Sequence, residues 1–331
     1  MISDPGAVEP LLRAEGLTKR FALTRGISGA GGEVLPALRG VSFAIAPGQT
    51  LGLVGESGSG KTTAGRIVAR LVQPDAGRIL FDGTDWLALS GAALRQQRRQ
   101  LQVVFQDPQN SLNPRMRAGA QIAEPLRIQG LARGRALTER VRQLLADVGL
   151  GAETASRFPS DLSGGQRQRV AIARALATSP RLVVCDEPVS ALDVSVGAQI
   201  VNLLLDLRER AGLSYLFISH DLAVVSRMAD RIAVFYLGAI VEEGPAREVI
   251  GRPLHPYARA LVAAAVESDP SAPPRAPALP GELPSAVNPP SGCHFHPRCP
   301  IARPRCGQEA PVLSDSGPGR RVACFYPGEM G

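Results

Sequence analysis

A glycine-rich segment at residues 55–62, GESGSGKT, constrains the fold more than any other part of the chain. It follows the apolar run TLGLV at residues 50–54 and precedes a helical pattern, so the expected order is strand, loop, helix. Glycines let the backbone curl until successive N–H groups point at one place, and a helix beginning near Gly60 adds the positive end of its dipole. The pattern predicts a phosphate-binding loop in an α/β fold. The alternative, a Gly/Ser linker that precedes a lysine by chance, leaves the flanking strand and helix unexplained.

The loop residues have separate roles in this prediction. Lys61 would bring a positive charge to the β- and γ-phosphates of a nucleotide, and Thr62 would offer its hydroxyl to a Mg²⁺ ion. The residues expected to contact the nucleotide are Gly55, Glu56, Ser57, Gly58, Ser59, Gly60, Lys61, Thr62 and Thr63.

Acidic residues follow a second apolar run, LVVC at residues 182–185. Ligands of open parallel sheets bind beyond the carboxyl ends of the strands, so Asp186 and Glu187 are expected at the same crevice as the phosphate loop. Asp186 can then hold the metal, and Glu187 can polarise a water for attack on the γ-phosphate. Cys185 is expected to be a small buried hydrophobe and not a nucleophile. Taken alone, an acidic pair after a strand also suits a helix N-cap.

A third strand-like run, SYLFI at residues 214–218, leads into Ser219-His220-Asp221. One helix-length segment separates it from the acidic strand, and a right-handed crossover would return it to the same edge of the sheet. His220 is therefore a candidate catalytic residue. A histidine that serves only the structure at a strand end is the alternative.

The segment DLSGGQRQRVAIARAL, residues 161–176, is a second glycine-led helix start. With it the sequence resembles the ATP-binding cassette (ABC) family over nearly all of its first 265 residues. The matching motifs are the phosphate loop, Gln106 in VVFQDP, Leu162–Gln166, LVVCDEP, SALD ending at Asp193, and ISHD with His220.

The resemblance implies an α/β P-loop NTPase cassette at residues 10–265. It would have a RecA-like parallel sheet core, an N-terminal antiparallel β part and an inserted helical subdomain at about residues 108–172. It also implies ATP as the nucleotide, with Glu187, His220 and Gln106 as catalytic residues. The Mg²⁺ ligands would be Thr62, Gln106 and Asp186. Phe21 would stack on adenine, although a core aromatic on an early strand explains it equally well.

In the family two cassettes pack head to tail, so that each site is shared. Four residues of one chain would then cap the ATP held by Lys61 of the other, and Asp193 would lie beside this site. The four are Ser163, Gly164, Gly165 and Gln166. One copy of each motif gives a chain two half-sites, so it needs a partner cassette, which we expect to be a related but non-identical subunit.

The strings SLNPR, EPL and HPY resemble the ATP-binding subunits of bacterial dipeptide and oligopeptide importers. This implies two transmembrane permease subunits as partners, a substrate-binding protein acting through them, and a place on the cytoplasmic face of the inner membrane. Nickel and glutathione importers are relatives with the same features. No apolar run approaches the ~18 residues of a membrane span, and the segment MISDPGAVEPLL shows neither the basic nor the apolar region of a signal peptide, so we expect the chain to stay in the cytoplasm.

The net charge of +7 raises an alternative, a soluble ABC ATPase that acts on nucleic acid or ribosomes. The basic residues are scattered, and a solvated basic face accounts for them. The chain also has one cassette and no heptad run. We therefore expect no nucleic-acid partner.

Composition changes after the cassette. Residues 266–291 are rich in proline and predict an extended linker. Residues 292–331 form a small extension with four cysteines, and its GCHFHPRCP string again resembles the peptide importers. Four thiolates suit a [4Fe–4S] cluster or a zinc ion, although no C-x₂-C pair is present. Reduced structural thiols and disulfides stay open as alternatives, the latter disfavoured in the cytoplasm. The four are Cys293, Cys299, Cys306 and Cys324.

Overall fold

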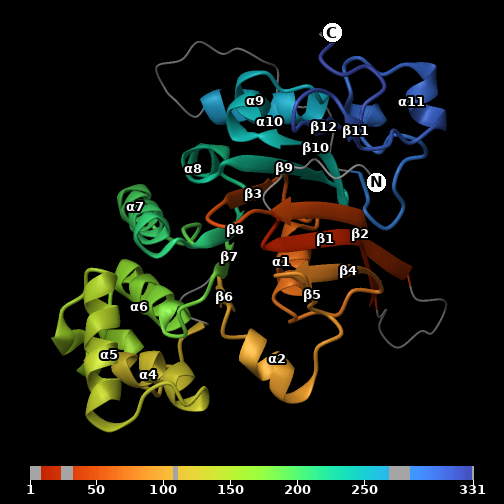
Figure 1. Ribbon diagram of the computed structural model, residues 1–331. Helices are drawn as coiled ribbons and strands as arrows, with labels where there is room; N and C mark the ends of the chain where they lie inside the picture. The colour runs from red at the N-terminus through yellow and green to blue at the C-terminus, as the bar shows by residue number, and fades with distance from the viewer. Residues whose placement is uncertain (1–8, 24–32, 107–110, 268–283, 330–331) are drawn as a thin grey trace, which may run out of the picture. The chain divides into compact units, whose positions relative to one another are not determined.

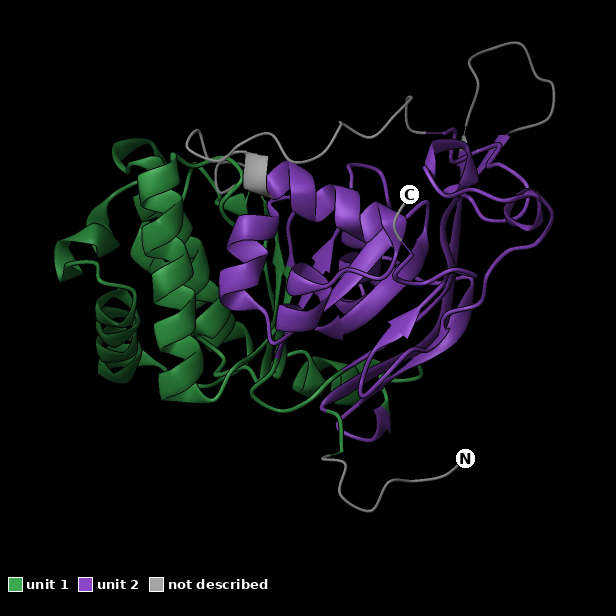
Figure 2. Ribbon diagram, turned by 90° about the horizontal axis from the view of Figure 1, so that it is seen from above, with its two compact units in different colours: residues 1–10, 45–49, 85–217 green, residues 11–44, 50–84, 218–331 purple. Residues whose placement is uncertain are grey.

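The computed structural model describes residues 9–23, 33–106, 111–267 and 284–329. The chain forms two compact units, coloured separately in Figure 2. The first unit comprises residues 1–10, 45–49 and 85–217, and the second comprises residues 11–44, 50–84 and 218–331. Each unit therefore assembles segments that are far apart in the sequence.

The strands of the first unit lie in the order β8-β7-β6. β6 and β7 are parallel, with Val104 opposite Cys185. Every residue of β7 is buried, as the apolar run predicts for a strand covered on both faces. The strands are β6 (Leu101–Val104), β7 (Leu182–Asp186) and β8 (Ser214–Ile218). The helices are α2 (Gly91–Gln97), α4 (Ala118–Ile128), α5 (Gly134–Asp147), α6 (Gly164–Leu176) and α7 (Val194–Ala211), with 3₁₀ turns η1 (Ala152–Ser156) and η2 (Pro159–Asp161).

Helices α4, α5 and α6 pack together within this unit, in the yellow-green part of Figure 1. Four residues of α5 recur at helical spacing on its buried face: Leu137, Val141, Leu144 and Leu145. This cluster is the inserted helical part of the fold. The start expected at residue 108 lies outside the described residues, so the limits of the subdomain stay a prediction.

The second unit contains two groups of strands. The first group has the order β2-β1-β4-β5, in which β1 and β4 are antiparallel, and this confirms the antiparallel N-terminal β part. The second has the order β11-β12-β10-β9-β3, in which β3 and β9 are parallel. The bounds of the first group are β1 (Leu12–Leu23), β2 (Glu33–Ile45), β4 (Ala76–Phe81) and β5 (Thr84–Asp85). Those of the second are β3 (Thr50–Val54), β9 (Arg231–Tyr236), β10 (Ala239–Pro245), β11 (Ser314–Asp315) and β12 (Arg321–Val322).

The helices of the second unit include the one that follows the phosphate loop. They are α1 (Lys61–Val68), α8 (Leu222–Met228), α9 (Ala246–Gly251), α10 (Pro256–Glu267) and α11 (Pro304–Gln308), with the 3₁₀ turn η3 (His296–Arg298). Most of the expected proline-rich linker, residues 268–283, lies outside the described residues. Within the described ranges, no helix has the length and apolar character to cross a bilayer.

Candidate nucleotide site

The phosphate loop joins β3 to α1, and its glycines adopt backbone angles that other residues rarely reach. Gly55 has φ of 146° and Gly60 has φ of 104°. A Cβ atom at Gly55 would lie 2.2 Å from the carbonyl oxygen of Phe235, and one at Gly60 would lie 2.5 Å from that of Ala37. Both the conformation and the close packing therefore require glycine.

Lys61 folds back across the loop. Its Nζ donates to the carbonyl oxygens of Gly55 and Glu56 at 2.7 and 2.8 Å, and to Ser59 Oγ at 3.3 Å. The side chain is only 5% exposed. Gly60, the N-cap of α1, supplies no side-chain cap to the first turn. The loop thus combines a positive charge with the N-terminal end of a helix, which is how proteins bind phosphate groups.

Two backbone groups of the loop, one N–H and one carbonyl, also form fixed contacts within the second unit. Glu56 N donates to Tyr257 Oη at 2.8 Å, and Gly238 N donates to Ser59 O at 2.9 Å. Gly238 belongs to the turn between β9 and β10. The loop is therefore held by segments that follow it by about two hundred residues, and the sequence pattern did not indicate these partners.

His220 follows β8, in the second unit with the loop. Ser219 N donates to Leu53 O at 3.2 Å, so the backbone just before His220 runs beside the end of β3. Asp221 caps α8 by accepting from Ala223 N and Val224 N. The imidazole is thus on a short segment fixed at both ends.

Glu187 and Gln106 are paired in the first unit. Gln106 Nε2 donates to Glu187 Oε2 at 2.8 Å. Both residues follow carboxyl ends of neighbouring parallel strands, β6 and β7, which explains why they meet. Glu187 has a positive φ of 48°, an unfavourable angle for this residue type that is often found at functional sites. Asp186 is the buried last residue of β7.

The second glycine-led helix start, that of α6, carries its own cap. Ser163 Oγ accepts from Gln166 N at 3.3 Å, and Gln166 Oε1 accepts from Ser163 N at 3.0 Å, which makes a reciprocal capping box. A Cβ at Gly165 would lie 2.6 Å from Val196 Cγ1, so a larger residue there would have to displace the Val196 side chain. Asp193 is the N-cap position of α7 in the same unit, and the next residue, Val194, is 92% exposed.

Two further predicted residues have distinct surroundings. Phe21 lies near the end of β1 and is partly exposed, with Lys19 Nζ 5.5 Å from its ring centroid. Cys185 is fully buried, and burial raises the pKa of its thiol, so it stays protonated. This agrees with the expected packing role.

All five cysteines are free thiols, and the four of the C-terminal extension line one small cavity together with His296. Burial raises the pKa of Cys299 to about 11 and also raises those of Cys293 and Cys324. In the described part of the chain, no group of three or more His, Cys, Asp or Glu residues is arranged so that it could hold a metal ion.

A glycine-rich phosphate loop between a parallel strand and a helix, in an α/β fold, defines the class of P-loop nucleoside triphosphatases. The ABC transporter family model matches residues 38–190, and the model for the oligopeptide/dipeptide transporter C-terminal region matches residues 241–306. A probable peptide ABC transporter ATP-binding protein of Sinorhizobium fredii is 50% identical over 96% of this chain and 90% of its own length. The dipeptide transport ATP-binding protein DppF of Haemophilus influenzae is 44% identical, over 96% and 97%.

Solved structures give the same result. A dimeric bacterial ABC transporter cassette is 33% identical with a TM-score of 0.63, covering 71% of this chain and 99% of that chain. A related dimeric structure in a post-hydrolysis state with ADP and Pi is 32% identical with the same TM-score. The chain belongs to the ABC transporter family, in its group of peptide-importer ATP-binding subunits. It binds and hydrolyses ATP in the presence of Mg²⁺.

Proposed function

We propose that this ATPase powers the import of dipeptides or oligopeptides. The observation that carries the substrate class is the match of residues 241–306 to the oligopeptide/dipeptide transporter C-terminal region, in a chain whose residues 38–190 match the ABC transporter model. The names of the relatives support the same substrate class. Nickel or glutathione import is the next candidate. A soluble ABC ATPase acting on nucleic acid or ribosomes is the last, because the peptide-type C-terminal region would then have no role.

Glu187 is the general base of the proposed hydrolysis. The hydrogen bond from Gln106 Nε2 orients its carboxylate and leaves the amide oxygen of Gln106 to face a metal ion. Mg²⁺ held by Thr62, Gln106 and Asp186 would neutralise charge on the phosphates. Lys61 and the backbone N–H groups of the loop bind the β- and γ-phosphates. His220 contacts the γ-phosphate end of the site, and Phe21 stacks on adenine.

Pairing with a second cassette completes the proposed site. Ser163, Gly164, Gly165 and Gln166 of one subunit would cap the ATP on the other, with Asp193 next to them. The dimeric state of the solved cassettes supports this arrangement. The N-terminus of α6 also supports it, because a helix that begins with two glycines and has Ser163 as its N-cap can face a phosphate group. The partner is a related, non-identical ATP-binding subunit.

The chain works at the cytoplasmic face of the inner membrane, bound to two permease subunits that receive substrate from a binding protein. ATP-driven pairing of the cassettes would then be coupled to the permease.

The C-terminal cysteines are proposed to hold a [4Fe–4S] cluster or a zinc ion. Four thiols that line a single cavity have the donor chemistry for either group, although the side chains as arranged in the described residues do not form a metal site. Burial raises the pKa values of Cys293, Cys299 and Cys324, and a cation bound there would favour the thiolate forms instead. Anaerobic purification followed by measurement of bound iron, sulfide and zinc tests this assignment. Intact protein without any of the three would exclude it.

Co-purification from membranes tests the transport function. We expect the full chain to purify with its permease subunits and to hydrolyse ATP faster in that complex than alone. A chain that neither purifies with membrane-embedded subunits nor responds to them would contradict the proposal. Stimulation by peptides, and not by nickel or glutathione, would assign the substrate.

A further inference from the structure

The cysteine-containing extension, residues 292–329, is seated on the second unit by strand pairing and a buried ion pair. β12 pairs antiparallel with β10, with Val322 opposite Glu242. Glu242 is fully buried, and its carboxylate accepts from Leu254 N, His255 N and Arg320 Nη2. Because a buried carboxylate with several charge-assisted hydrogen bonds is costly to separate from its partners, the extension has one defined position on this unit.

One side chain of this extension reaches the phosphate loop. Arg298 ends the turn η3, and its Nη1 and Nη2 donate to Glu56 Oε2 and Oε1 at 2.9 and 3.0 Å. The Arg298 side chain is 7% exposed and that of Glu56 is 28% exposed. Both oxygens of the carboxylate therefore meet both terminal nitrogens of the guanidinium, the geometry that fixes the orientation of both groups.

Glu56 is well placed to pass this restraint on to the nucleotide site. Its carbonyl oxygen accepts from Lys61 Nζ at 2.8 Å, and its N–H donates to Tyr257 Oη. The residues on either side of it in the loop include Gly55 and Gly58, which do not restrict the backbone themselves. The carboxylate is also a negative charge in a loop that binds a polyanion. A bidentate arginine both orients Glu56 and cancels that charge.

The position of Arg298 is itself supported by packing. Phe295 is buried and contacts two aromatic rings of the same unit, those of Tyr236 at 5.3 Å and Tyr257 at 5.5 Å between centroids. Arg298 N donates to Phe295 O at 3.0 Å. The turn that presents the guanidinium is therefore held by an aromatic cluster that also contains the hydroxyl bonded to Glu56 N.

We propose that Arg298 is a positioning residue for the phosphate loop, so that the cysteine-containing extension forms part of the ATP-binding apparatus. This inference rests on the proposed binding of ATP at Gly55–Thr62. Arg298 acts through Glu56 and does not contact the nucleotide. Its loss leaves the chemistry of hydrolysis in place and lowers affinity, because an unpaired carboxylate then stands in the loop.

The test is a double-mutant cycle on the full-length chain, with ATP affinity and steady-state hydrolysis as readouts. Arg298→Met should raise the Kd and KM for ATP about tenfold while kcat stays within about twofold. In the Glu56→Gln background the same change should add less than about twofold, because the charge that Arg298 compensates is gone. Arg298→Lys should restore part of the affinity, since it keeps the charge without the fork.

A matched control is Arg303→Met, which removes an ion pair with Glu329 on the surface of the same extension. It should leave the Kd unchanged. Equal Kd values for Arg298→Met and Arg303→Met would overturn the inference, and so would full additivity in the cycle. If Arg298→Met fails to fold, Arg298→Lys is compared in the wild-type and Glu56→Gln backgrounds instead. Equal effects on the Kd in both backgrounds would again overturn the inference. Wild-type chain that does not bind ATP would instead overturn the proposed nucleotide site.

Discussion

Two helices of this protein begin with glycine-rich segments, and their N-termini differ. At α1 the N-cap is Gly60, no side chain caps the first turn, and Lys61 adds a charge. At α6 the N-cap is Ser163, whose hydroxyl is already bonded to the backbone of its own first turn. Both suit an anion, but only at α1 does the N-cap residue make no side-chain hydrogen bond to the first turn. We therefore expect α1 to bind ATP on its own chain, and α6 to act only when a partner cassette brings ATP.

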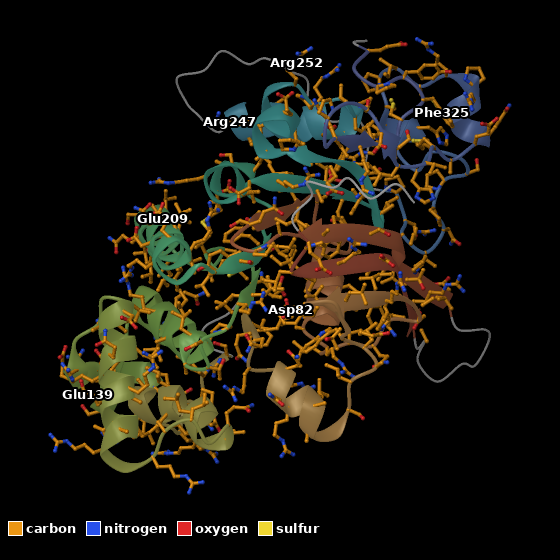
Figure 3. All side chains as sticks on the ribbon, in the orientation of Figure 1. Asp82, Glu139, Glu209, Arg247, Arg252 and Phe325 are labelled. Carbon is orange, nitrogen blue, oxygen red and sulfur yellow. The ribbon has the colours of Figure 1, made fainter. Side chains whose placement is uncertain are left out.

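The largest effect is expected from a substitution that removes the general base and leaves both helix N-termini intact. Glu187→Gln should lower ATP turnover by about 10²–10⁴-fold without loss of ATP binding, because the base is lost and the phosphate donors are kept. Phosphate release and equilibrium ATP binding measure the two parts. The control is Glu209→Gln, since Glu209 is an exposed residue of α7 (Figure 3) and takes no part in the proposed site. Multiple-turnover hydrolysis by Glu187→Gln at the wild-type rate would show that Glu187 is not the general base.

Lys61→Ala tests the α1 side of the comparison. It removes a charged donor of the loop and should weaken ATP binding by the isolated chain about 10–100-fold. Titration calorimetry measures this directly. Lys61→Arg keeps the charge and serves as the matched variant, which should bind ATP more tightly than Lys61→Ala. Unchanged affinity in Lys61→Ala would contradict the loop assignment.

Ser163→Ala tests the α6 side. Turnover at saturating ATP should fall about tenfold, while ATP affinity of the isolated chain stays within about twofold. The lost cap should also cost about 1 kcal/mol of stability, measurable by denaturant unfolding. Ser160→Ala, in the preceding exposed turn, is the control. A fall in affinity of the isolated chain equal to that of Lys61→Ala would show that the two helix starts do not differ as we infer.

The smallest expected effect concerns adenine. Phe21→Ala should weaken ATP binding about fivefold through lost stacking, and Phe21→Tyr should retain it. Competition between ATP and inorganic triphosphate separates the contributions of base and phosphate. Only the affinity for ATP should change. Equal losses for both ligands would assign Phe21 to packing of β1 instead.

Features set by neighbouring residues were predictable from the sequence. The strand before the loop ends at Val54 and the helix begins at Lys61, because glycines and an apolar run determine both locally. The buried strand that carries Cys185 followed from its apolar composition in the same way. The antiparallel β part and the parallel strand pairs followed from the family resemblance.

Contacts between distant segments were not predictable. Arg298 and Glu56 are 242 residues apart, and Tyr257 and Glu56 are 201 apart, so no local pattern links them. The HPY and HPRC strings marked both segments, but they gave no information on what the side chains contact. The strand β12 is only two residues long and is specified by its pairing with β10, which a periodicity search cannot detect.

We propose that ATP hydrolysis with Glu187 as the general base drives peptide import. The most direct test is uptake of a labelled dipeptide into proteoliposomes that contain this chain, its partner cassette, the permease subunits and the binding protein. We predict ATP-dependent uptake with the wild type and with Glu209→Gln, and about 1% of that rate or less with Glu187→Gln. Uptake by the Glu187→Gln complex at the wild-type rate would contradict the claim.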